Sequence, residues 1–288
     1  MKTLFEKLSP YLRLMRVDRP IGTLLLLWPT LAALWIASEG KPDITVLIVF
    51  VLGVFIMRSA GCVINDYADR KVDGLVERTS NRPLITGELQ AKDALKLFAG
   101  LGITAFLLVL LLNPFTIALS VVGLFLAATY PFMKRYTYLP QVYLGAAFGW
   151  AIPMAFAAQT NEVPAVAWLL FLANVLWATA YDTFYAMADR KDDLKAGVKS
   201  TAILFGDDDR MIIGVLQVSV LMVMLLIGSQ LSMSFSYYLG IIIAAVLFVY
   251  QQNISKRKDA AQCMHAFLNN NWVGAALFAG IVGHYAMS

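Results

Sequence analysis

Two acidic segments hold most of the side chains in this chain that could do chemistry. Six of the 19 Asp and Glu residues lie in 66–93, and seven lie in 182–209. Residues 68–73 read ADRKVD and residues 188–193 read ADRKDD, so five of six positions match across a separation of 120 residues. This match indicates an internal duplication, and internal symmetry of this kind often marks a site between the two halves.

Helical spacing would align the polar side chains of each segment. In both segments they recur at intervals of four or seven residues, which places them on one face if the helix continues. Two facing rows of carboxylates would repel, so such a site requires cations. Hard oxygen ligands favour Mg²⁺ or Ca²⁺ over zinc, and Mg²⁺ is commonly held together with substrate phosphates. The predicted metal ligands are Asn65, Asp66, Asp69, Asp73, Asp182, Asp189 and Asp193, of which Asp69, Asp73, Asp189 and Asp193 are the catalytic candidates.

The elements that carry these residues are predicted to lie in a membrane. The chain has 288 residues, is 59% apolar and only 15% charged, and has a mean hydropathy of +0.68. Soluble domains are about 45–50% apolar and about 25% charged, so an ordinary soluble enzyme is excluded. Because lipid offers no partner for an open backbone, we predict an all-α polytopic membrane protein with one domain over 1–288. The predicted spans are 21–37, 44–64, 95–112, 115–132, 138–158, 164–184, 211–229, 235–252 and 268–286.

The distribution of basic residues supports nine transmembrane helices, read as two related four-helix halves plus one. All but two of the 23 Lys and Arg lie in the N-terminus or in the loops after spans 2, 4, 6 and 8; Lys41 lies on the opposite side and Arg58 lies inside span 2. The positive-inside rule places the charged side in the cytoplasm. The loops after spans 2 and 6 would then form a cytoplasmic cap, and the C-terminus would be periplasmic. The chain begins without a cleavable signal or transit segment, which favours a bacterial inner membrane.

Basic residues beside the acidic segments predict a phosphate-bearing substrate, because a metal with Arg and Lys is the usual clamp for a diphosphate. The candidates are Arg78, Arg82, Lys134, Arg135 and Lys199, although the positive-inside bias alone would explain several of them. No basic run with interleaved aromatics indicates a nucleic-acid partner. A third acidic run, Asp207–Asp209, precedes Arg210 and is predicted to be solvated.

Arg58 differs from the other basic residues because it lies within an apolar run, where charge is costly and usually functional. It precedes Asn65 by seven residues, which places it about 10 Å deeper at 1.5 Å per residue. A cation at this depth could bind the anionic end of a second substrate. The alternative is an ion pair within the bundle. The polar run Asn269–Asn271 at the start of the last span has no role assigned from the sequence.

With these motifs the chain resembles the UbiA superfamily of intramembrane aromatic prenyltransferases. The family motif N-D-x-x-D-x-x-x-D is matched by residues 65–73, and the motif D-x-x-x-D is matched by residues 189–193, with Asp182 one helical face upstream. Longer stretches such as MRSAGCVINDYADRKVDG and AYDTFYAMADRKDD resemble the bacterial members that prenylate 4-hydroxybenzoate in ubiquinone synthesis. The similarity runs from about residue 11 to the ninth predicted span.

The resemblance implies a nine-helix bundle with a cytoplasmic cap, Mg²⁺ as cofactor, a long-chain polyprenyl diphosphate as donor and 4-hydroxybenzoate as acceptor. The acceptor would be prenylated meta to its carboxylate, with release of diphosphate, and the prenyl chain could leave into the lipid bilayer. The two motifs would hold the Mg²⁺–diphosphate, Arg78 and Lys134 would contact the diphosphate, and Arg58 would hold the benzoate carboxylate. The ring proton would pass to an aspartate or to the released diphosphate.

Two other functions remain open from the sequence. One is a related transferase with a different acceptor, such as a naphthoate, a homogentisate or a haem. The other is a cation transporter, since duplicated acidic helices also suit ion pathways. A transporter would carry acidic residues near the middle of the membrane, whereas here they lie at helix ends beside a basic cluster, which favours a phosphate-bearing substrate.

Overall fold

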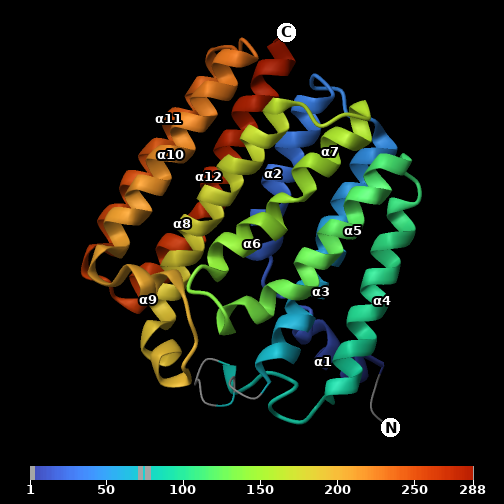
Figure 1. Ribbon diagram of the computed structural model, residues 1–288, viewed down its shortest axis with the longest axis vertical. Helices are drawn as coiled ribbons and strands as arrows, with labels where there is room; N and C mark the ends of the chain where they lie inside the picture. The colour runs from blue at the N-terminus through green and yellow to red at the C-terminus, as the bar shows by residue number, and fades with distance from the viewer. Residues whose placement is uncertain (1–3, 71–73, 75–78, 288) are drawn as a thin grey trace.

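The protein is a bundle of helices, seen in a computed structural model that describes residues 4–70, 74 and 79–287. Every regular element in these residues is helical, which confirms the all-α prediction. The long helices run side by side, and α1 lies near the opposite end of the bundle from the C-terminus of α12 (Figure 1). The elements are α1 Leu4–Leu14, α2 Ile21–Ala37, α3 Ile44–Asp69, α4 Ala91–Val109, α5 Pro114–Thr129, η3 Tyr130–Arg135, α6 Pro140–Gly149, α7 Ala151–Thr160, α8 Ala165–Ala196, α9 Thr201–Phe205, η4 Gly206–Asp208, α10 Asp209–Gln230, α11 Phe235–Ile254, η5 Ser255–Arg257 and α12 Ala260–Met287.

Short polar turns define where several helices begin. The Asp43 carboxylate accepts hydrogen bonds from the first-turn amides of α3, at 2.8 Å from Thr45 and 3.1 Å from Val46. Asn113 caps α5 in the same way at 2.9 Å from the Thr116 amide, and Pro114 takes the first helical position, where its missing N–H has no cost. These caps satisfy amides that no helical carbonyl can reach.

A break divides one predicted span into two helices. The range 138–158 is occupied by α6 and α7, which meet at Trp150. Pro153 explains the position of the break, because it lacks the N–H that would bond to the carbonyl of Gly149 in a continuous helix.

The surface of the bundle is that of a multi-pass membrane protein. Within the described residues, six helical segments are long and apolar enough to cross a membrane. They are Ile44–Asp69, Pro114–Arg135, Pro140–Thr160, Ala165–Ala196, Thr201–Gln230 and Phe235–Arg257. Of the remaining predicted ranges, 21–37 coincides with α2, an apolar helix of 17 residues, while 95–112 overlaps α4 and 268–286 lies within α12; these three helices are not among the six.

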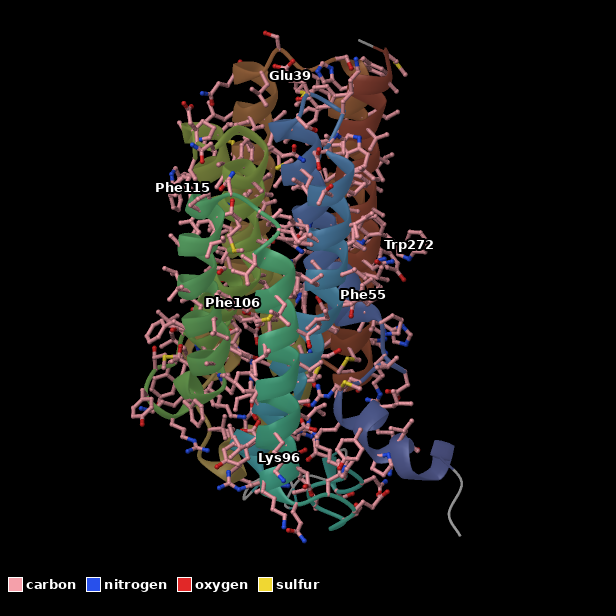
Figure 2. All side chains as sticks on the ribbon, turned by 90° about the vertical axis from the view of Figure 1, so that its right-hand side faces the viewer. Glu39, Phe55, Lys96, Phe106, Phe115 and Trp272 are labelled. Carbon is pink, nitrogen blue, oxygen red and sulfur yellow. The ribbon has the colours of Figure 1, made fainter. Side chains whose placement is uncertain are left out.

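Apolar side chains cover the long sides of the bundle and charged groups lie at its ends. Phe55, Phe106 and Trp272 point outward and are 44–63% exposed, while Glu39 and Lys96 mark opposite ends (Figure 2). This distribution fits a body whose sides contact lipid.

Three consecutive asparagines on α12 join three different helices. The side-chain oxygens of Asn269–Asn271 accept, in order, hydrogen bonds from Gln251 of α11 at 3.0 Å, Trp177 of α8 at 2.9 Å and Trp28 of α2 at 2.9 Å. Polar contacts of this kind hold helices together where lipid supplies no hydrophobic driving force. The structure thus assigns a packing role to a run that the sequence left unexplained.

Candidate active site

A cavity of about 740 Å³ extends through the bundle along α3. Its lining residues on that helix run from Val49 to Asp69, which corresponds to about 30 Å at 1.5 Å per residue. Most of the charged lining gathers where α3 and α8 end in the two acidic motifs, with Arg58 farther along α3, and the lining from α4, α5 and α7 is mostly apolar. A cavity with one charged end and a long apolar wall suits an amphiphilic substrate with an anionic head.

The first motif lies on α3, which continues five residues beyond the predicted span. Asn65 Nδ2 donates to Asp69 Oδ2 at 3.2 Å, and the Lys134 ammonium of η3 forms an ion pair with the same carboxylate. All three side chains line the cavity, although Asp69 is only 4% exposed. The structure therefore brings a predicted metal ligand and a predicted diphosphate ligand together. Asp73 and Arg78 lie outside the described residues.

Asp66 occupies a different place from the one predicted for a metal ligand. It is 2% exposed and is not among the cavity-lining residues. Its Oδ1 atom is paired with Arg16 at 2.7 Å and with Arg82 at 3.0 Å, and both arginines do line the cavity. Bound between two guanidinium groups, this carboxylate orients two cations toward the cavity.

Arg16 is a site residue that the sequence did not reveal beyond its positive charge. It precedes α2 and has a left-handed backbone with φ of 53°, a conformation that is uncommon for residues other than glycine. Burial alone would lower the pKa of its guanidinium, but the attraction of Asp66 raises the pKa above its ordinary value. Arg16 therefore remains a cation at the wall of the cavity.

The second motif lies on α8, a helix of 32 residues that is followed by Gly197 in the left-handed region. Asp182, Asp189 and Asp193 all line the cavity that the first motif lines. Asp182 lies close enough to Arg58 and Asp189 to interact with them electrostatically. The described residues of the two predicted acidic faces, Asn65 and Asp69 on α3 and these three aspartates on α8, thus line one cavity.

The donor set of this cavity end fits a divalent metal bound together with a diphosphate. In the part of the chain that is described, no three acidic, His or Cys side chains are close enough together to hold an ion by themselves. Mg²⁺ is typically held by one or two carboxylates with the remaining positions taken by water and substrate phosphates. Hard oxygen donors on two facing helices meet that requirement, and no closed protein cage is needed.

The other predicted diphosphate ligands differ in where they point. Lys199 lines the cavity, donates to the Tyr136 carbonyl at 3.3 Å and lies 5.3 Å from the centre of the Tyr138 ring. Arg135 is not among the cavity-lining residues, and its Nη2 donates to the Ala68 carbonyl at 2.5 Å. Arg135 therefore ties η3 to the end of α3, which places the neighbouring lysine of η3 beside the first motif.

Arg58 lines the cavity farther along α3, as its spacing from the motif predicts. Its Nη1 contacts Cys62 Sγ, and its buried Nε has no hydrogen-bond partner. Among the described side chains it forms no salt bridge, and its electrostatic partner on α8 is Asp182. Its guanidinium is available to an anion that enters the cavity.

The prediction that Asp207–Asp209 is solvated is wrong for Asp209. This residue is fully buried at the start of α10 and is ion-paired with Arg190 and, at 2.9 Å, with Lys258. Arg190 immediately follows the motif residue Asp189 on α8, so the pairs connect the second motif to the start of α10.

Comparison with known proteins gives concordant results. The model of the UbiA prenyltransferase family matches residues 26–278. The 4-hydroxybenzoate octaprenyltransferase of Nitrosococcus oceani is 62% identical over 280 residues, which cover 97% of this chain and 98% of that protein. The protein of the same name from Alcanivorax borkumensis is 58% identical, with coverage of 98% and 97%.

Solved structures share the fold. A UbiA homologue from Aeropyrum pernix K1 superimposes with a TM-score of 0.80 at 24% identity, covering 93% of this chain and 98% of that one. A UbiA homologue from Archaeoglobus fulgidus bound to GPP and Mg²⁺ superimposes with a TM-score of 0.72 at 18% identity, covering 97% and 100%.

Proposed function

The chain belongs to the UbiA prenyltransferase family, and from that membership we propose that it transfers a polyprenyl group from its diphosphate to 4-hydroxybenzoate, a step of ubiquinone synthesis. The observation that carries this proposal is the identity of about 60%, over nearly the full length, to relatives named 4-hydroxybenzoate octaprenyltransferase. The cavity supports it, because one charged end and a long apolar wall match the two parts of a prenyl diphosphate.

The two acidic faces would hold Mg²⁺ with the donor's diphosphate. Asn65 and Asp69 on α3 and Asp189 and Asp193 on α8 supply oxygen ligands around one cavity end, and Asp182 lies on the same helix nearer to Arg58. The ion, when bound, would supply charge neutralisation that makes diphosphate a better leaving group. A solved family member bound to GPP and Mg²⁺ shares this fold and supports the choice of cofactor.

The chain's own cations complete the diphosphate site. Lys134, Lys199 and the Asp66-bound pair Arg16 and Arg82 line the same cavity. As the allylic C–O bond breaks, its electron pair goes to the diphosphate, and these cations stabilise the charge that develops there. The apolar wall excludes water, which would otherwise capture the allylic cation.

Arg58 positions the acceptor. Its guanidinium would bind the carboxylate of 4-hydroxybenzoate, about 10 Å along the helix from Asn65. The ring carbon ortho to the hydroxyl and meta to the carboxylate then forms the new C–C bond. Loss of the proton from that carbon to an aspartate or to the released diphosphate restores aromaticity.

The membrane arrangement belongs to the same proposal. Nine crossings would be made by α2, α3, α4, α5 with η3, α6 with α7, α8, α10, α11 and α12. The N-terminus and the charged end of the cavity would face the cytoplasm, and the C-terminus would face the periplasm of a bacterial inner membrane. The basic residues concentrated on one side support this orientation, as do α1 and the end of α12 at opposite ends of the bundle (Figure 1).

The test uses purified protein in detergent with Mg²⁺, radiolabelled 4-hydroxybenzoate and a polyprenyl diphosphate, and measures label that becomes extractable into organic solvent. We expect transfer by the wild type, loss of transfer with EDTA, and much slower transfer by Asp69→Asn and Asp189→Asn at the same Mg²⁺ concentration. Folded wild type that transfers nothing to 4-hydroxybenzoate but prenylates a naphthoate or homogentisate would reject the acceptor. If the protein prenylates none of these acceptors, the transferase activity is rejected. Ion flux in liposomes would then test the cation-transporter alternative.

A further inference from the structure

The guanidinium of Arg58 lies directly against a glycine of the neighbouring helix. Gly22 is a buried residue in the first turn of α2, and it lines the same cavity as Arg58. A Cβ atom added to Gly22 would lie 2.6 Å from Arg58 Cζ and closer still to Nε and Nη2. Real Cβ atoms do not approach other heavy atoms so closely, so the guanidinium occupies space that only a glycine leaves open.

The guanidinium has protein contacts on two sides. Nη1 contacts Cys62 Sγ one turn farther along α3, while the other side of the fork lies against Gly22. A guanidinium binds a carboxylate in two parallel hydrogen bonds only when its planar fork is turned correctly, unlike the point charge of a lysine. A glycine surface that fixes the plane therefore fixes the direction from which an anion can be bound.

We propose that Gly22 is a positioning residue for the acceptor, because the space that it leaves lets the Arg58 guanidinium lie where it can bind the acceptor's carboxylate. The inference rests on the proposed function, in which Arg58 binds a carboxylate-bearing aromatic acceptor. The new element is that the preference for an acceptor with a carboxylate depends on Gly22, a residue without a side chain. Gly22→Ala displaces the flexible end of Arg58 rather than the backbone, so the fold has room to survive the change.

The chain offers matched controls. Gly53 and Gly61 lie on α3 and line the same cavity, yet a Cβ added at either position would meet nothing within 4 Å. Alanine at either position adds the same methyl group to the cavity wall without touching the guanidinium. A weaker binding of the acceptor that appears only in Gly22→Ala therefore cannot come from a smaller cavity alone.

The experiment measures kcat and KM for 4-hydroxybenzoate and, separately, for the polyprenyl diphosphate. For Gly22→Ala we expect the KM for 4-hydroxybenzoate to rise by about tenfold or more, the scale of one lost charge-assisted hydrogen bond. The KM for the donor should stay within about twofold of the wild-type value, well below that scale. The ratio of kcat/KM for 4-hydroxybenzoate to that for its methyl ester should fall, because the ester has no carboxylate for Arg58 to bind. Gly53→Ala and Gly61→Ala also narrow the cavity, but they should not lower the ratio of kcat/KM for 4-hydroxybenzoate to that for its methyl ester.

A double-mutant cycle with Arg58→Lys assigns the effect to the guanidinium. Lysine retains the charge but has no planar guanidinium to lie against Gly22. Adding Gly22→Ala to Arg58→Lys should therefore raise the KM for 4-hydroxybenzoate little further. The proposal is overturned if Gly22→Ala raises the acceptor KM by the same factor in the wild type and in Arg58→Lys. It is also overturned if Gly22→Ala leaves the acceptor KM unchanged. If Gly22→Ala does not fold, Arg58→Lys alone must raise the acceptor KM without changing the donor KM, and failure to do so overturns it equally. Wild type that does not prenylate 4-hydroxybenzoate would instead reject the underlying function.

Discussion

Asp66 is the residue at which the sequence and the structure predict different results for one substitution. As a metal ligand, it would lose Mg²⁺ affinity on conversion to asparagine. In the structure it is buried between Arg16 and Arg82 and does not line the cavity. Asp66→Asn should therefore leave the Mg²⁺ requirement unchanged, lower the stability, and weaken binding of the diphosphate donor.

The magnitude follows from the burial of the three groups. Removing one partner of a buried ion pair costs about 3–5 kcal/mol, because the remaining charge stays uncompensated. The side chains of Arg16 and Arg82 keep 23% and 17% of their surface exposed, so water screens part of that cost. We expect the lower end, about 3 kcal/mol, seen as a fall in Tm. Release of both arginines should raise the donor KM by about tenfold to a hundredfold, the scale of a hydrogen bond to a charged group.

The assay titrates Mg²⁺ at saturating donor and compares Asp66→Asn with Asp69→Asn, which lies on the same helix and does line the cavity. Asp69→Asn should raise the Mg²⁺ concentration needed for half-maximal activity, and Asp66→Asn should not. If Asp66→Asn raises that concentration as much as Asp69→Asn does, with the Tm unchanged, then Asp66 is a metal ligand and the reasoning from its arginine partners is refuted.

Three further outcomes are expected. Arg58→Ala should raise the KM for 4-hydroxybenzoate by about tenfold or more while the donor KM stays constant, measured by steady-state kinetics; an equal rise in both would contradict its role. Asp209→Asn leaves two partly exposed cations without their carboxylate and should cost about 3 kcal/mol, measured as a lower Tm, whereas the same change at the exposed Asp207 should leave the Tm unaltered. Asn270→Leu removes the acceptor of the Trp177 indole and should lower stability by about 0.6–2 kcal/mol, and an unchanged Tm would show that this bond between α8 and α12 contributes nothing.

The helical fold and the place of the site could be predicted because both depend on local patterns. Apolar runs separated by polar loops predict the helices, and spacings of four and seven predict that each acidic segment shares one face. Asn65 and Asp69 fulfil that prediction, since they are hydrogen-bonded to each other and line the cavity. The break at Trp150 was visible in principle from Pro153, because a proline removes the bond to the residue four positions earlier.

The partner of each carboxylate could not be predicted, because it depends on which distant segment packs beside it. Asp66 is one residue from Asn65, which turns its side chain by about 100° around the helix at 3.6 residues per turn. On that side lies Arg16, which is 50 residues earlier in the chain. No spacing in the sequence distinguishes the face that meets the cavity from the face that meets the segment before α2.

The duplicated motif also shows that the partners of charged residues could not be predicted from the sequence. Each half has a buried aspartate that is paired with two cations: Asp66 within the first motif, and Asp209 at the start of α10 in the second half. Arg70 and Arg190 occupy the same place in the repeat, yet only Arg190 reaches such an aspartate. Arg70 donates to the Tyr67 carbonyl at 2.5 Å and lies 4.1 Å from the centre of that ring. Among the described residues, the repeat therefore preserves Asp69 and Asp189, which line the cavity, whereas each half holds its motif helix through contacts of its own.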